Sequence, residues 1–208
     1  MHLCRLSSAA GVELVRRAKD LGLPVTCDIS INSLHLTDQD IGYFDSRMRL
    51  SPPLRQQRDR DALREGLADG TVDALVSDHT PVDEDAKTLP FAEAEAGATG
   101  LELLLSLALK WGQDSGVGLT RALAVLTQEP ARVLGSSLGT LQASCGQLVD
   151  GGVADVCIFD PQAHWVVEPG ALRSQGQNTP FSGYELPGHV RCTIVGGQVV
   201  WDAAATRA

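Results

Sequence analysis

A carboxylate lies two positions after a β-branched, largely apolar run of the chain. Asp78 follows the run Thr71–Val76 after a single serine, and His79 comes next. A strand of a (β/α) barrel delivers a carboxylate to the mouth of an active site in this way. The other interpretation is a structural aspartate that accepts hydrogen bonds from loop amides. Asp78 is therefore the leading candidate for a catalytic or metal-ligating residue, whereas His79 should point away from it and make a structural hydrogen bond.

A cation follows the short apolar run at the start of the chain. Alternation along a strand predicts that Leu3 and Arg5 share one face, with His2 and Cys4 on the other. A guanidinium has no lone pair for a metal and stays protonated, with a pKa above ~12. The same alternation predicts that His2 cannot readily replace Arg5 as a ligand. Arg5 would therefore disable any metal site that included its position.

Composition limits the partners of the chain. It has 208 residues, 43% of them hydrophobic, and a net charge of -9 without a cluster of basic residues. Nucleic acid and anionic membranes are therefore excluded as expected partners. No apolar run approaches the ~20 residues of a membrane span, and no signal peptide is recognisable. Five widely spaced cysteines without a CxxC pair predict reduced thiols, no structural zinc site and a cytoplasmic location.

Residues 1–135 alternate short apolar runs with helical patterns. The predicted strands are His2–Leu6, Pro24–Ile29 and Thr71–Ser77, and the predicted helices are Ser8–Leu21, Arg58–Leu67, Leu101–Trp111 and Leu119–Leu126. This alternation is typical of parallel βαβ units. A complete (β/α)₈ barrel takes about 250 residues. We therefore expect an α/β fold that contains only the last three or so βα units of a TIM barrel.

Residues 136–208 have a different pattern, in which glycine-rich turns separate short β-type runs. The predicted strands are Gly146–Val149, Val153–Phe159, Trp165–Val167, Arg191–Val195 and Gln198–Trp201. This region is expected to form a second, small β-rich domain, a β-sandwich segment after the partial barrel.

Several short segments carry a family resemblance through their order and spacing. They are His2–Ser8, Val25–Asp28, Pro52–Arg55, Asp69–Ala74 with Ser77–His79, Gly100–Glu102, Pro130–Gly135, Ala154–Val156 and Asn178–Phe181. Together they resemble the class I dihydroorotases of the cyclic amidohydrolase superfamily. The resemblance covers nearly the whole chain but only the C-terminal half of a family member. It implies the barrel type of the metal-dependent hydrolases.

The resemblance also implies roles for individual positions. Asp78 matches a last-strand aspartate that ligates zinc and shuttles a proton, and Arg5 stands where the family has a zinc-ligating histidine. The positions of two adjacent family histidines hold Asn32 and Ser33. Three substrate-binding positions are altered or weakly matched; they are Ser51, Val82 and Gly97. Because Arg5 and Asp78 match positions that converge on one metal, we predict that they form an ion pair and that no zinc binds there.

The segments that carry the resemblance are thus kept, whereas nearly all the positions at which the family binds metal or substrate have changed. By resemblance, this favours a non-catalytic dihydroorotase-like partner of aspartate carbamoyltransferase in pyrimidine biosynthesis, and a homo-oligomer is also compatible with the pattern. One alternative is an active zinc dihydroorotase, which converts carbamoyl aspartate to dihydroorotate, or a related cyclic amidohydrolase, represented here by its C-terminal part. Another alternative is a fragment that does not fold alone, since three strands cannot close an eight-stranded barrel.

Overall fold

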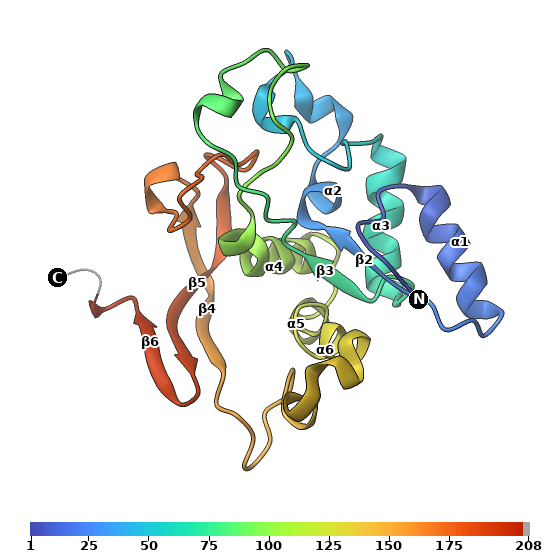
Figure 1. The fold of residues 1–208 in the computed structure, drawn as a ribbon, viewed down its shortest axis with the longest axis vertical. Helices are drawn as coiled ribbons and strands as arrows, with labels where there is room; N and C mark the ends of the chain where they lie inside the picture. The colour runs from blue at the N-terminus through green and yellow to red at the C-terminus, as the bar shows by residue number, and fades with distance from the viewer. Residues whose placement is uncertain (206–208) are drawn as a thin grey trace.

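A parallel sheet and an antiparallel sheet organise the protein (Figure 1). The computed structural model describes residues 1–205. The parallel sheet has the order β1-β2-β3, with β1 at His2–Leu3, β2 at Thr26–Ser30 and β3 at Ala74–Val76. In its register His2 is opposite Thr26, and Asp28 is opposite Ala74. This is the predicted succession of parallel βα units.

The helices begin and end close to the predicted positions. Helix α1 (Ala9–Asp20) starts at Ser8, whose Oγ accepts a hydrogen bond from the amide of Gly11 at 3.2 Å, and Gly22 turns the chain after it with a φ of 73°. The other α-helices are α2 (Ile31–His35), α3 (Gln57–Asp69), α4 (Leu104–Asp114), α5 (Leu119–Ala124) and α6 (Gln128–Leu134). Short 3₁₀ helices are η1 (Asp38–Ile41), η2 (Ser46–Met48), η3 (Asp85–Lys87), η4 (Leu101–Leu103), η5 (Gly135–Ala143) and η6 (Pro169–Ala171).

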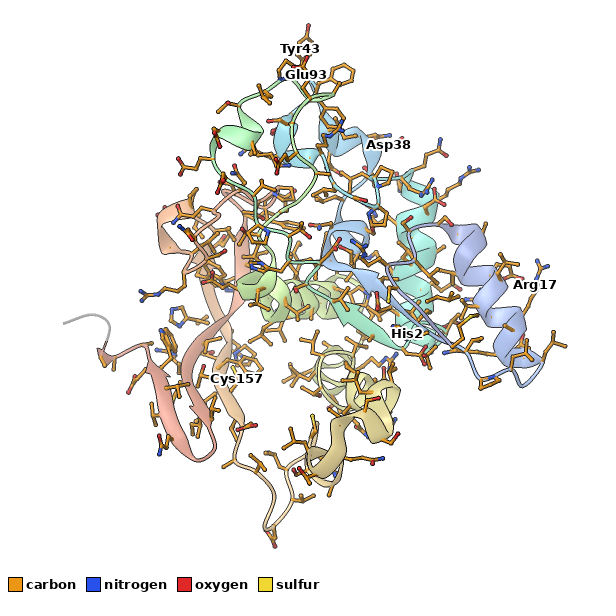
Figure 2. The ribbon with its side chains drawn as sticks, viewed as in Figure 1. His2, Arg17, Asp38, Tyr43, Glu93 and Cys157 are labelled. Atoms are coloured by element: carbon orange, nitrogen blue, oxygen red, sulfur yellow. The ribbon has the colours of Figure 1, made fainter. Side chains whose placement is uncertain are left out.

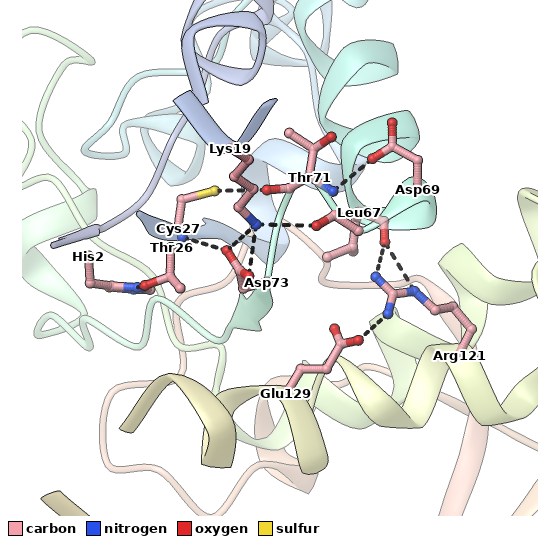
Figure 3. A network of polar contacts seen from close by, with 11 residues as sticks. His2, Lys19, Thr26, Cys27, Leu67, Asp69, Thr71, Asp73, Arg121 and Glu129 are labelled. Atoms are coloured by element: carbon pink, nitrogen blue, oxygen red, sulfur yellow. Dashed lines mark hydrogen bonds and ion pairs between the residues drawn. The ribbon is translucent and has the colours of Figure 1, made fainter. Parts of the chain in front are cut away.

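The two faces of the parallel sheet differ in chemistry. Cys27, Ile29 and Leu75 belong to the buried apolar cluster that also contains side chains of α1 and α3. The register places Asp28 and Ala74 on the opposite face, together with His2. Polar groups also tie the helical layer to the strands, since Lys19 of α1 bonds both carboxylate oxygens of Asp73 at 2.8 and 2.9 Å (Figure 3).

The C-terminal region forms one antiparallel sheet. Its strands are β4 (Val156–Val166), β5 (Glu185–Val195) and β6 (Gln198–Asp202), in the order β4-β5-β6. Within residues 1–205 no second sheet faces it, so a β-sandwich is not formed by this chain alone. The sheet contacts α4 instead: Trp165 Nε1 donates to Ser106 Oγ at 3.0 Å, and Ser106 Oγ donates to the carbonyl of Gly188 at 3.3 Å.

Several predicted strands differ from the structure. The predicted strand Trp165–Val167 is mostly the end of β4, and the predicted strand Thr71–Ser77 is shortened to β3. Two further differences have local reasons. β1 ends at Leu3 rather than Leu6, because Arg5 adopts a left-handed φ of 55° that interrupts an extended chain. Residues 146–149 leave a turn and continue as irregular chain rather than as a strand. Gly146 has a φ of 74° there and lies so close to Thr127 that a Cβ would come within 2.8 Å of its carbonyl oxygen. In the described part of the chain, no helix is long and apolar enough to cross a membrane.

Candidate functional site: a guanidinium opposite the strand-end carboxylate

The predicted ion pair between Arg5 and Asp78 is present. Arg5 Nη1 lies 3.1 Å from Asp78 Oδ1 and also donates to the carbonyl of Ser51 at 3.0 Å. The Asp78 side chain is 8% exposed and the Arg5 side chain 45% exposed. Arg5 and Asp78 both have left-handed φ values, 55° and 49°. Such conformations are uncommon for these residue types, and here they occur where two chain segments turn toward one another past the strand ends.

Strand alternation does not describe the position of Arg5 correctly. Leu3 packs against the apolar core, whereas the Arg5 side chain reaches Asp78. Leu3 and Arg5 therefore do not share a face, because β1 ends before residue 5 and the chain turns there. His2 is not remote from this site either: its Nε2 lies 2.8 Å from Asp28 Oδ2, and Asp28 Oδ1 accepts the backbone N–H of Arg5 at 2.7 Å.

A small cavity gathers most of the positions that the sequence singled out. Its volume is about 60 Å³, and its lining includes Arg5, Asn32, Ser51, Asp78 and Gly97. Val82 is not among the lining residues and instead lies beside Gly97. A Cβ at Gly97 would come within 3.1 Å of Val82 Cγ1 and 2.5 Å of the Thr80 carbonyl oxygen, and the φ of 152° at Gly97 also disfavours a side chain. Gly97 thus permits a close approach of two loops at the cavity.

His79 makes the structural interaction that its position predicted. Its Nδ1 accepts hydrogen bonds from the amides of Gly100 and Leu101 at 3.2 and 3.3 Å. These contacts fix the start of η4. His79 also borders a larger cavity of about 650 Å³ between α4 and the antiparallel sheet, with Trp165 and His189 on the other side. No local sequence pattern indicates this cavity, because its walls come from segments that are far apart in the chain.

The residues around the small cavity do not fit a zinc ion. Its lining offers one carboxylate, the Asn32 side chain and a guanidinium that already bonds the carboxylate. Zinc sites in proteins use several imidazole, thiolate or carboxylate ligands. Ser33, at the other position of the predicted histidine pair, is 8% exposed and offers only a hydroxyl. The arrangement is that of a carboxylate neutralised by a fixed side-chain cation.

Comparison with known proteins identifies the family of the chain. The model of the amidohydrolase family matches residues 4–200. A dihydroorotase-like protein of Pseudomonas aeruginosa is 43% identical over 201 residues, which cover 97% of this chain and 46% of that protein. A dihydroorotase of Citrifermentans bemidjiense is 36% identical over 203 residues, 98% of this chain and 46% of that protein. The chain thus spans about half the length of the curated relatives it matches.

Solved structures give the same assignment at the level of the fold. The L-hydantoinase (dihydropyrimidinase) of Arthrobacter aurescens superimposes with a TM-score of 0.86 at 29% identity, over 97% of this chain and 44% of that one. A D-hydantoinase has a TM-score of 0.85 at 24% identity with the same coverage, which supports the fold alone. The parallel and antiparallel sheets together correspond to part of the fold of these proteins. The chain therefore belongs to the amidohydrolase family.

Proposed function

We propose that the protein is a non-catalytic dihydroorotase-like protein of pyrimidine biosynthesis that supports the assembly of aspartate carbamoyltransferase in the cytoplasm. The observation that carries this proposal is the Arg5–Asp78 ion pair inside a cavity of about 60 Å³. In this reading the parallel sheet is a segment of a (β/α)₈ barrel, and the pair stands where the dihydroorotases hold zinc.

The physical reason is the permanent charge of Arg5. The amidohydrolase family is metal-dependent, and its catalytic metal polarises a carbonyl or activates water. A guanidinium offers no lone pair, and its charge repels a divalent cation. It does neutralise Asp78, whose burial without a counter-charge would cost several kcal/mol. The pair therefore keeps the architecture of the site and removes the basis of its chemistry.

Two relatives support the non-catalytic reading through their names. The proteins of Pseudomonas aeruginosa and Pseudomonas putida, 43% and 41% identical to this chain, are both called dihydroorotase-like. Aspartate carbamoyltransferase as the partner follows from the resemblance to non-catalytic dihydroorotase-like proteins. The direct test is co-purification of tagged protein with the aspartate carbamoyltransferase of the same genome. We expect a stable complex, and the same complex with Asp78→Asn, because assembly would not require the carboxylate; two proteins that elute separately at micromolar concentration would contradict the proposal.

An active zinc dihydroorotase is the second candidate. Asp78 is retained at the end of β3, and several relatives at 36–40% identity are called dihydroorotase. Because this chain covers 46% of those proteins, further ligands could only come from other chain segments. The discriminating assay measures ring closure of carbamoyl aspartate by the longest native form with added zinc. We expect no turnover; turnover that Asp78→Asn abolishes would establish the enzyme instead.

A further inference from the structure

Three metal-ligating side chains meet at the first two parallel strands, outside the Arg5–Asp78 cavity. They are His2 of β1, Cys4 just beyond it and Asp28 of β2, and their ligand atoms all lie within 4.8 Å of one another. We propose that His2, Cys4 and Asp28 form a binding site for a borderline divalent metal such as zinc. The resemblance assigns metal ligation to the positions of Arg5 and Asp78, so this site shares no residue with it.

The imidazole and the carboxylate are already oriented toward one another. His2 Nε2 lies 2.8 Å from Asp28 Oδ2. His2 Nδ1 lies 2.8 Å from Thr26 Oγ1, and Figure 3 shows the side chains of His2 and Thr26 next to each other. The backbone N–H of Arg5 holds Asp28 Oδ1 at 2.7 Å. Metal-bound histidines commonly donate their other ring N–H to such an outer partner, and ligating carboxylates are hydrogen-bonded in the same way. Thr26 and the Arg5 amide would fill these outer positions.

The dimensions require only a small adjustment. A tetrahedral ion with ligand bonds of about 2.0–2.3 Å separates its ligand atoms by about 3.3–3.8 Å. Nε2 of His2 and Oδ2 of Asp28 must therefore move apart by about half an ångström. The sulfur of Cys4, which already lies within 4.8 Å of these ligand atoms, must come closer to them. For Nε2 of a neutral His2 to bind the ion, its proton moves to Nδ1, which can then donate to Thr26 Oγ1. Cys4 releases its thiol proton to solvent, so that Zn²⁺, one thiolate, one carboxylate and a neutral imidazole sum to zero charge.

The ligand set selects the class of metal. Thiolate and imidazole favour zinc and its neighbours in the first transition row over magnesium or calcium, which prefer oxygen. Cys4 is exposed, and the side chains of His2 and Asp28 are 28% and 9% exposed. A metal can thus enter from solvent, and the fourth coordination position is open to water. Cys27 is unsuited to this role, because burial and the nearby charge of Asp73 raise the pKa of its thiol to about 11.

Cobalt(II) provides a readout that does not depend on activity. The complete chain, stripped with chelator and kept reduced, is titrated with Co²⁺ alone while near-ultraviolet absorption is recorded. We expect one equivalent to bind with a thiolate-to-cobalt charge-transfer band. Cys4→Ser should abolish the band and weaken binding at least tenfold, and His2→Gln should weaken it similarly. Cys145→Ser is the matched control, since Cys145 is also an exposed free thiol, and it should change nothing.

The outcomes separate this site from the Arg5–Asp78 cavity. Circular dichroism of each variant verifies that it is folded. Absence of a charge-transfer band at saturating Co²⁺, or a band that persists in Cys4→Ser, would overturn the proposed site and leave the proposed function intact. Asp78→Asn should bind Co²⁺ like the parent protein. Loss of binding in that variant would place the metal beside Arg5 and overturn both proposals.

Discussion

The ion pair between Arg5 and Asp78 consists of a half-exposed guanidinium and a buried carboxylate. Their energetic roles are therefore unequal. Asp78 depends on Arg5 for compensation of its charge, whereas Arg5 could be hydrated without Asp78. If Arg5 stands in place of a metal ligand, as proposed, this asymmetry explains why it is compatible with folding, because Arg5 supplies the positive charge that Asp78 requires.

Removal of the cation tests this dependence. Arg5→Met should lower the free energy of unfolding by about 1–3 kcal/mol, because it leaves a buried acceptor without its partner. Arg17→Met is the matched control, since Arg17 pairs with Glu13 at the surface and such pairs contribute about 0–1 kcal/mol. Urea unfolding measures both variants. The double variant Arg5→Met/Asp78→Asn should be more stable than Arg5→Met alone; equal losses in Arg5→Met and the control would contradict the account.

Individual site residues can be predicted from the sequence where they belong to a recognisable motif. The pairing of Arg5 with Asp78 follows from the resemblance, which places both positions at one metal, together with the positive charge of Arg5. Ser51 and Gly97, also singled out by the resemblance, lie at the same cavity. The His2–Cys4–Asp28 cluster was missed. Alternation was extended through residue 6, and only the backbone turn at Arg5 shows that His2 and Arg5 both contact Asp28.

Helix α2 connects the parallel sheet to the rest of the core through one histidine. His35 Nε2 lies 2.9 Å from the carbonyl of Leu107 in α4, and therefore carries the hydrogen. The His35 ring meets the ring of Phe181 edge to face, with centroids 6.1 Å apart. Loss of hydration in this position lowers the pKa of His35 to about 3.

The low pKa of His35 predicts loss of stability in mild acid. The folded protein keeps His35 neutral, while the unfolded chain binds a proton near pH 6.5, so the stabilising effect is complete above pH 6.5 and declines as the pH falls toward 3. Between pH 6.5 and 5 the free energy of unfolding should fall by up to about 1.4 kcal/mol per pH unit. His35→Gln should flatten this slope, whereas the same change at the exposed His164 should not. A slope that is unchanged in His35→Gln would contradict this prediction.

A buried lysine fixes the loops that border the small cavity. Lys87 is 7% exposed, and its Nζ donates to the carbonyls of Ser46, Arg49 and Glu95 at 3.2, 3.1 and 2.6 Å. These carbonyls belong to the two segments that lead into Ser51 and Gly97. The ammonium group thus holds together two loops that have no strand pairing of their own in the described chain.

Lys87→Met is expected to release these loops. The substitution keeps the apolar stem but removes the ammonium from three carbonyls. The carbonyls of Ser46 and Arg49 keep a backbone amide donor, from Arg49 and Gly97 respectively, so the expected cost is about 1–3 kcal/mol. Proteolysis within residues 38–49 should accelerate at the same time, because local opening becomes easier. Lys110→Met, which removes a surface pair with Asp114, provides the comparison. Lys87→Met with unchanged stability and unchanged cleavage would show that the lysine is dispensable.

The sheet edges limit what this chain can do as an isolated molecule. β1 pairs with β2 alone among the described residues, and the antiparallel sheet extends from the body with large apolar side chains exposed, among them Val199 at 60% (Figures 1 and 2). Such edges and faces favour association with other chains. The sequence predicted the partial sheet from its three βα units. It could not predict the single C-terminal sheet, because alternating patterns do not reveal which faces are covered.

The isolated 208-residue chain should therefore self-associate. Light scattering with gel filtration is expected to give a mass above that of one chain, 22.0 kDa, which increases with concentration in the micromolar range. A partner that covers these surfaces should shift the distribution to a defined complex. A monomer that persists at high concentration and binds no hydrophobic dye would show that the exposed edges and faces of the two sheets do not drive association.

We propose that the guanidinium of Arg5 occupies the place of a metal beside Asp78. Anomalous diffraction at the zinc edge, from crystals of the complete chain equilibrated with zinc, tests it most directly. We expect an intact Arg5–Asp78 ion pair and no anomalous density within bonding distance of Asp78, whether or not a zinc ion is bound at Cys4. A zinc ion coordinated by Asp78, with Arg5 turned away from it, would contradict the account.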